Sequence, residues 1–148
     1  MTDPTSLPDF PPPPGEHPLR GRVLDALMDE GFRPDIDDDG DVAFRAQGQQ
    51  LFVRCIDGEF TIMRVFGQWQ IGEDLADPVK QLQVCNALTL RLNVVKAGIA
   101  NGTLVVTGEH VVDASTDIKA LLTVTTQLLL SAVQMWHEGM VSDGGATA

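Results

Sequence analysis

Hydrophobic residues recur at helical spacing in the first part of the chain and again near its end. Between residues 19 and 31 the apolar positions lie three and four residues apart, and Gly31 suits the left-handed conformation that commonly ends a helix. Residues 117–139 form a longer and mostly apolar stretch, which we expect to follow Ser115 or Thr116 as the N-cap. The pattern therefore predicts an amphipathic helix at 19–31 and a long buried helix at 117–139.

A further helix is predicted at residues 78–93. Asp77 is a favourable N-cap residue, and Pro78 occupies the first helical position, where a missing N–H breaks no hydrogen bond. One apolar stripe runs along the expected helix; it consists of Val79, Leu82, Cys85, Leu88 and Leu92. Such a stripe packs either against the rest of the domain or against a partner.

The other hydrophobic residues occur in short runs of β-strand character. Four runs precede the 78–93 helix and two follow it; they span residues 32–36, 41–46, 50–56, 59–69, 94–99 and 103–112. Asn101-Gly102, between the last two runs, is a strong signal for a tight hairpin turn. Because strands and helices are grouped rather than alternating, the sequence predicts an α+β fold with helices packed on one antiparallel sheet. The expected element order is α-β-β-β(-β)-α-β-β-α.

The distribution of proline indicates where the folded domain begins. Seven of the nine prolines lie in residues 1–18, which have no apolar period, so we expect a disordered Pro-rich tail there. Residues 141–148 are polar and rich in small residues, and we expect a second disordered tail. A chain of 148 residues is long enough for one core, so residues 19–140 are predicted to form a single domain.

Charge and composition narrow the classes of partner. A formal net charge of -11 argues against nucleic acid and anionic membranes, because binding to phosphate groups needs clustered Lys and Arg. Residues 120–136 carry no charged side chain, but this run is shorter than the roughly 20 residues of a membrane span.

The N-terminus has no basic region followed by an apolar run, and Cys55 and Cys85 lack metal-ligand spacing. We therefore expect a cytoplasmic protein with two reduced cysteines.

An acidic stretch at residues 35–41 resembles the start of a calcium-binding loop. Asp35, Asp37 and Asp39, followed by Gly40, occupy positions that an EF-hand loop fills with ligands and a glycine. The loop would need a closing glutamate, and Ala46 stands at that position, followed by strand-like rather than helical sequence. We therefore interpret the stretch as the turn of a hairpin. The alternative is a weak metal-responsive sensor that uses the three aspartates as ligands.

No recognised catalytic motif occurs in the sequence. His17, His110 and His137 are far apart, and Ser115 and Ser131 lie outside any Gly-x-Ser-x-Gly elbow. The sequence therefore predicts a protein that is not an enzyme and that needs no cofactor. An enzyme whose site is assembled from distant residues remains the alternative.

An ordered series of motifs resembles the bacterial YbjN family between residues 19 and 139. The series begins with "RVLDALMDEGFRPDIDDDGDVAF" and "LFVRCIDGEFTIMRVFGQW", continues with "VCNALTLRLNVVKAGI" and "NGTLVVTGEHVVD", and ends with the apolar helix. Members of this family are described as sensory transduction regulators and are similar in fold to type III secretion chaperones. The resemblance implies a secretion-chaperone-like fold, a homodimer, and a binding or regulatory role without chemistry of its own.

The expected function is therefore that of a protein-binding or regulatory module, chaperone-like or sensory-regulator-like, acting on an unidentified protein partner as a homodimer. Four residues are candidates for the partner or dimer interface. Trp69 is one of them because tryptophan is enriched at interface hot spots. The others, on the 78–93 stripe, are Leu82, Leu88 and Leu92.

Overall fold

The structure is a computed structural model that describes residues 18–142. Residues 1–17 and 143–148, on which most of the two predicted tails falls, lie outside the described residues. The elements, in chain order, are α1 (Pro18–Asp29), β1 (Asp35–Ile36), β2 (Val42–Ala46), β3 (Gln49–Ile56), β4 (Ile62–Gln70), the short 3-10 helix η2 (Glu73–Leu75), α2 (Pro78–Arg91), β5 (Val95–Ala100), β6 (Thr103–Val111) and α3 (Ile118–Val141). This order confirms the predicted α+β class, with four strands before α2.

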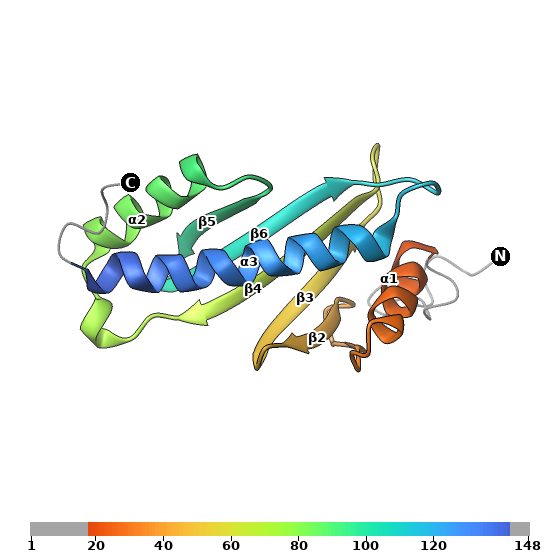
Figure 1. Cartoon of the computed structure of the whole chain (residues 1–148), viewed down its shortest axis with the longest axis horizontal. Coiled ribbons are helices and arrows are strands. Elements are labelled where there is room, and N and C mark those ends of the chain that lie inside the picture. The colour runs from red at the N-terminus through yellow and green to blue at the C-terminus, as the bar shows by residue number, and fades with distance from the viewer. Residues whose placement is uncertain (1–17, 143–148) are drawn as a thin grey trace, which may run out of the picture.

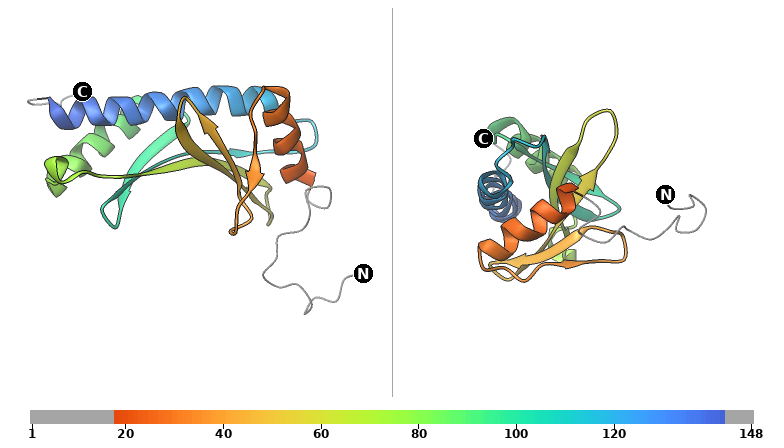
Figure 2. Two further views of the ribbon diagram at one scale, coloured as in Figure 1. Left: turned by 90° about the horizontal axis from the view of Figure 1, so that it is seen from below. Right: turned by 90° about the vertical axis from the view of Figure 1, so that its right-hand side faces the viewer.

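The six strands form one open antiparallel sheet in the order β1-β2-β3-β4-β6-β5. The helix α3 runs along the length of the sheet, α1 lies near β2 and β3, and α2 lies beside β5 (Figure 1). The sheet lies to one side of α3 in Figure 2, so in the part of the chain that the structure describes the helices leave the other face of the central strands uncovered.

The core lies between the sheet and α3. Alternate residues of β3, β4 and β6 point into it and are fully buried; they include Leu51, Val53, Met63, Val65, Leu104 and Val106. Gly108 lets α3 approach the sheet closely, because a Cβ at this position would lie 2.6 Å from Cγ2 of Thr125. Trp136 of α3 is fully buried and fills the largest volume in this layer. Burial of these apolar side chains is the main source of stability.

The long helix α3 is apolar enough to cross a membrane by length and composition alone. The core helix of a folded protein meets the same criterion. Nine of its residues are buried in the domain: Ile118, Leu122, Thr125, Thr126, Leu129, Ala132, Val133, Trp136 and Met140. Its outward positions include Gln127, Ser131 and Gln134, which are polar and exposed. The buried face and the polar outer face together are typical of a core helix.

The N-cap predicted for α2 is confirmed, and the one predicted for α3 is wrong. The Asp77 side chain accepts hydrogen bonds from the N–H groups of Val79 and Lys80, which begin α2. The cap of α3 is Asp117, whose carboxylate accepts from the N–H of Ala120. Ser115 and Thr116 do not cap the helix because both are held in a preceding turn by the carboxylate of Asp113.

Glycine and asparagine supply the left-handed backbone where the sequence predicted turns. Gly31 ends α1 with a φ of 92°, and Asn101 and Gly102 join β5 to β6 with φ values of 52° and 73°. One left-handed residue was not expected. Val94, between α2 and β5, has a φ of 74°, a strained conformation for a β-branched side chain. The helix α2 ends at Arg91, two residues before the predicted end, because its C-cap Leu92 is already in an extended conformation.

Candidate functional site

The acidic stretch forms the hairpin turn between β1 and β2. Asp37 shapes it, because its Oδ1 accepts hydrogen bonds from the N–H groups of Asp39 and Asp41, each at 3.0 Å. Gly40 completes the turn with a φ of 83°. Asp35 uses its own Oδ1 to accept from the N–H of Ile36 at 2.9 Å. The aspartates at the start of the candidate metal loop thus organise the backbone of a turn, in the way that Asx turns do.

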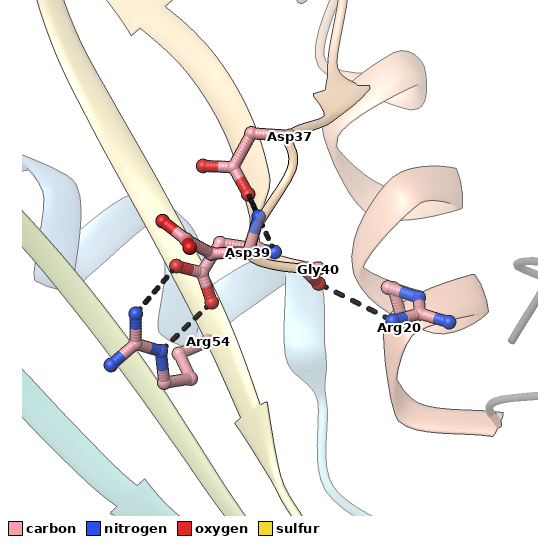
Figure 3. Close-up of polar contacts among 6 residues, drawn as sticks. Arg20, Asp37, Asp39, Gly40 and Arg54 are labelled. Carbon is pink, nitrogen blue, oxygen red and sulfur yellow. Dashed lines mark hydrogen bonds and ion pairs between the residues drawn. The ribbon is translucent and has the colours of Figure 1, made fainter. Parts of the chain in front are cut away.

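An ion pair between the buried Asp41 and the partly exposed Arg54 joins this turn to the sheet. Asp41 accepts two hydrogen bonds from Arg54 of β3, at 2.9 and 2.8 Å, and its side chain is only 4% exposed. The hydrogen bond with Asp41 raises the pKa of the Arg54 guanidinium. On the other side of the turn, Nη1 of Arg20 in α1 donates to the carbonyl of Gly40 at 3.3 Å. Figure 3 shows the turn held between Arg20 and Arg54 in this way.

Carboxylate oxygens of Asp37, Asp39 and Asp41 lie within 4.8 Å of one another, so Asp41 rather than Asp35 completes the acidic cluster. Both oxygens of Asp41 are already bonded to Arg54, and Oδ1 of Asp37 is bonded to two backbone N–H groups. A cation at this cluster would therefore compete with existing hydrogen bonds and with a guanidinium. The geometry fits a structural role for the acidic turn better than a ligand-binding one.

The uncovered face of the sheet carries a row of charged side chains. Arg54 of β3 lies directly opposite Arg64 of β4, and Arg64 lies opposite Glu109 of β6. Arg64 donates two hydrogen bonds to one carboxylate oxygen of Glu109, at 2.9 and 2.7 Å, and Nζ of Lys96 in β5 lies 2.7 Å from the other oxygen. The row, with Asp41 at its end, holds three cations and two carboxylates, and Asp37 and Asp39 beside Asp41 add negative charge near Arg54. The excess positive charge therefore lies at the other end of the row, where Arg64 and Lys96 share the one carboxylate of Glu109.

The cations in this row determine the ionisation of Glu109. Its hydrogen bonds with Lys96 and then with Arg64 lower the pKa of the carboxyl group, and they outweigh the opposing effect of burial. Glu109 is therefore an anion at neutral pH, and it offsets part of the positive charge of its two neighbours.

Two aromatic rings form the floor beside the charged row. Phe52 and Phe66 face each other across β3 and β4, with ring centroids 5.3 Å apart and planes inclined by 24°. The guanidinium carbon of Arg54 lies 5.2 Å from the centroid of the Phe66 ring. Phe66 is nearly buried although it points away from the helices, since it is 7% exposed. Such stacking and cation–π contacts hold the Arg54 side chain against the sheet.

Two adjoining hollows lie on this uncovered face and over its β5 edge. The first has a volume of about 220 Å³ and is bounded by Arg54, Arg64, Phe66, Gln68 and Glu109, together with the three residues named next. The second has a volume of about 350 Å³ and lies over β5, from Lys96 to Ala100, beside Thr89 of α2. They share Lys96, Val105 and Thr107, so they form one continuous depression, which we call the trough.

The predicted interface residues are not brought together in one patch. The Trp69 side chain is half-buried, lies over Gly67, and donates from Nε1 to Oε1 of Gln49 at 2.8 Å. Leu88 is 4% exposed and belongs to the core, and Leu92 packs against the same core from a half-buried position. Leu82 is 58% exposed and is available for a contact. Of the predicted leucine stripe, Leu88 thus supports the domain while Leu82 faces solvent.

The charged row was not identified from the sequence. The sequence does contain one sign of it. In each of the two strands an arginine and a phenylalanine are two residues apart, Phe52 with Arg54 and Arg64 with Phe66. A spacing of two places both residues of a pair on one face of the sheet. Glu109, however, is 45 residues from Arg64 in sequence and joins the row only because β4 pairs with β6. Glu109 and His110 lie on opposite faces of β6, as neighbours in a strand do. His110 points toward α3, and its Nε2 lies 2.7 Å from the Thr125 hydroxyl.

Comparisons with known proteins agree with the fold. Residues 17–145 match the model of the TY-Chap1 family, described as T3SS (YopN, CesT) and YbjN peptide-binding chaperone 1. The crystal structure of YbjN from E. coli, a proposed transcription regulator, is similar with a TM-score of 0.55 and 13% sequence identity. The similarity covers 78% of this chain and 86% of that one. No curated protein is significantly similar to the chain in sequence.

Proposed function

The chain belongs to the TY-Chap1 family of peptide-binding chaperones, and from this premise we propose that it binds polypeptide segments of another protein on the uncovered face of its sheet. The role is chaperone-like or regulatory, is located in the cytoplasm, and involves no catalysis. Membership of the family confirms the YbjN resemblance noted in the sequence. The observation that carries the proposal is the trough, which lies on a sheet face that the described helices leave open.

The sheet face is a better docking surface than the β5 edge. An extended peptide can add to a sheet by pairing with an edge strand, which requires free N–H and C=O groups along that edge. At β5 the middle of the edge is occupied, because the Thr89 hydroxyl hydrogen bonds with both the N–H and the C=O of Ala97. The trough, by contrast, offers aromatic, aliphatic and charged groups on one surface.

Selection from a library of random short peptides displayed on phage tests the proposed function. We expect reproducible enrichment of a limited set of sequences on the immobilised full chain, and competition for binding by the corresponding synthetic peptides. A helix-side substitution, Gln134→Glu on the exposed face of α3, is the matched control and should leave binding unchanged. Enrichment of no sequence above background would contradict peptide binding.

We also propose that the chain forms a homodimer. Three apolar side chains of α2 support it: Val79, Leu82 and Leu90 are 63%, 58% and 77% exposed. Exposed apolar residues that gather on one element are typical of association surfaces, whereas isolated ones are common on any protein. Of the predicted leucines, the proposed dimer contact on α2 therefore includes Leu82 but not the buried Leu88. The exposed Val79 and Leu90 complete the contact.

Light scattering and sedimentation of the purified chain test the dimer. The expected result is a mass of twice 16.0 kDa at micromolar concentration, and a shift to the single-chain mass for Leu82→Glu, which places a charge in the proposed contact. Val124→Glu, on an exposed apolar position of α3, is the control and should stay dimeric. A single-chain mass for the unsubstituted protein would rule out the dimer while leaving the peptide-binding proposal intact.

A further inference from the structure

We infer that the trough takes an extended peptide that places a carboxylate beside Arg64 and Lys96 and an apolar side chain over Gly98 and Val105. This inference rests on the proposed function and adds the chemistry of the ligand. The trough has two chemically different ends, one lined by charged groups and one lined by small and aliphatic groups.

At the charged end, the two cations Arg64 and Lys96 share a single carboxylate, which leaves an excess positive charge that attracts an anion. Arg54 and Arg64 stand directly opposite each other across β3 and β4, and like charges in that position repel. Arg54 is balanced by Asp41, with Asp37 and Asp39 also acting on its charge, whereas Arg64 pairs with Glu109. Lys96 shares Glu109 with Arg64 and is 64% exposed, so its ammonium group can turn toward a ligand. A carboxylate bound between these cations would relieve the repulsion and gain charge-assisted hydrogen bonds.

The contrast with the rest of the chain strengthens this assignment. The protein has a formal net charge of -11, yet three of its ten Lys and Arg side chains gather on this one face. An acidic partner would be repelled by most of the surface and attracted here, which is a simple way to select a docking site. A basic or neutral segment would gain nothing from this row and would leave the facing arginines unrelieved.

The other end of the trough is open because β5 carries small residues there. A Cβ built on Gly98 would have no atom within 4 Å, so nothing in the described domain fills the space above this glycine. Val105 lies opposite Gly98 on β6, and Ala100 follows on β5. An apolar side chain of a ligand would be removed from water on this surface, which favours its binding.

The sheet itself sets the spacing between the two ligand side chains. Arg64 and Gln68 are four residues apart on β4, which corresponds to about 13 Å along a strand. Gln68 is aligned with Val105, and Val105 with Gly98, so this length separates the charged row from the apolar end. The long side chains of arginine and lysine can extend from the charged row toward the apolar end and so shorten this distance. The carboxylate and the apolar side chain are therefore expected two to four residues apart in an extended peptide.

The test uses the peptides that the unsubstituted chain selects from the random library. We expect them to combine Asp or Glu with an apolar residue two to four positions away. Arg64→Gln and Lys96→Gln each remove one cation, and each should weaken binding of an acidic peptide by about tenfold, or about 1.4 kcal/mol. The analogue of the same peptide with Gln in place of its acidic residue should bind both variants and the unsubstituted chain equally.

Gly98→Val tests the apolar end independently. The substitution adds a branched side chain where there is open space, so the domain should fold as before while the trough is filled. Binding should fall by about tenfold, and the loss should disappear for a peptide whose apolar residue is replaced by Ser. The matched controls are Lys80→Gln, which removes a cation of α2 outside the trough, and Gly58→Val, at an exposed glycine of the β3–β4 turn with comparable space.

The outcomes separate this inference from the proposed function. Selected peptides without an acidic residue, or acidic peptides that bind Arg64→Gln, Lys96→Gln and Gly98→Val as well as the unsubstituted chain, would overturn the inference and leave peptide binding standing. A library that yields no enriched sequence would overturn both. Weakening by the trough variants, but not by the controls, is the result that the inference predicts.

Discussion

The indole of Trp69 lies directly over Gly67, where a Cβ would be only 2.3 Å from the ring atom Cη2 and 3.0 Å from Cδ2 of Leu51. Glycine is required at position 67 because the indole lies so close to the backbone, and not because the backbone conformation needs a glycine. The contact also explains why Trp69 is half-buried, because the ring covers the backbone of its own strand and is held by Gln49. The residue acts mainly as part of the sheet's packing.

Gly67→Ala should therefore destabilise the fold by about 2 kcal/mol, since an added methyl group forces the indole or the strand to move. Unfolding by urea, followed by tryptophan fluorescence, measures the change. Gly98→Ala is the control, because its Cβ meets no atom within 4 Å and its free energy of unfolding should hardly change. Equal stabilities for the two variants would show that the Trp69 contact is not as described.

Glu109 gives a prediction for the pH dependence of stability. Its pKa is lower in the folded protein than in the unfolded chain, so its contribution is fully present above the ordinary glutamate value of 4.5 and is lost as the pH falls through the lower folded value. The unsubstituted chain should be more stable than Glu109→Gln at neutral pH, and the difference should shrink below pH 4.5. Urea unfolding across this range checks it; a difference that grows on acidification would contradict the assignment.

Among the elements, the β1–β2 hairpin is attached to β3 by the β2–β3 ladder, and one ion pair strengthens this attachment at the turn. Asp41 is buried and bonded twice to Arg54, which is itself stacked on Phe66. Removing the carboxylate leaves the guanidinium without its principal partner, and removing a charged hydrogen-bond partner costs about 1.5–3 kcal/mol. The acidic turn thus links the first hairpin to the floor of the trough.

Asp41→Asn is expected to lower the free energy of unfolding by about 2 kcal/mol. It should also speed hydrogen exchange of the β2 amides more than that of the β6 amides, because the loss is local to the hairpin. Asp39→Asn changes an exposed carboxylate of the same turn and is the control. If both variants unfold like the original chain, the ion pair contributes nothing to the attachment of the hairpin.

Features that depend on neighbouring residues in the chain were predictable from sequence, and features that depend on distant residues were not. Asp77-Pro78 and Asn101-Gly102 act through neighbours in the chain, so the start of α2 and the β5–β6 turn were predicted correctly. The cap of α3 was missed because Asp113, rather than helix geometry, determines what Ser115 and Thr116 bind. The candidate surface was missed for a related reason. Arg64 contacts Glu109 only because β4 pairs with β6, and the residues near each strand in sequence do not indicate which strands pair.

At the scale of the whole molecule, the described residues form a sheet with the three α-helices on one face and the charged trough on the other. Three features carry its proposed function: the family of peptide-binding chaperones, the uncovered sheet face, and the excess of positive charge at Arg64 and Lys96 on that face. The proposed dimer contact lies on α2, away from the charged row. Peptide binding and self-association should therefore be separable, and Leu82→Glu should abolish the dimer without loss of peptide affinity.

The most direct test of the account is the location of a bound peptide. Amide chemical-shift changes in the ¹⁵N-labelled full chain, titrated with a library-selected peptide, should be concentrated in β5, from Val95 to Ala100, and in β6, from Thr103 to Glu109. The exposed face of α3, including Gln127, Ser131 and Gln134, should be unaffected. Changes confined to the helices, with β5 and β6 unchanged, would contradict the claim that the uncovered sheet face is the binding surface.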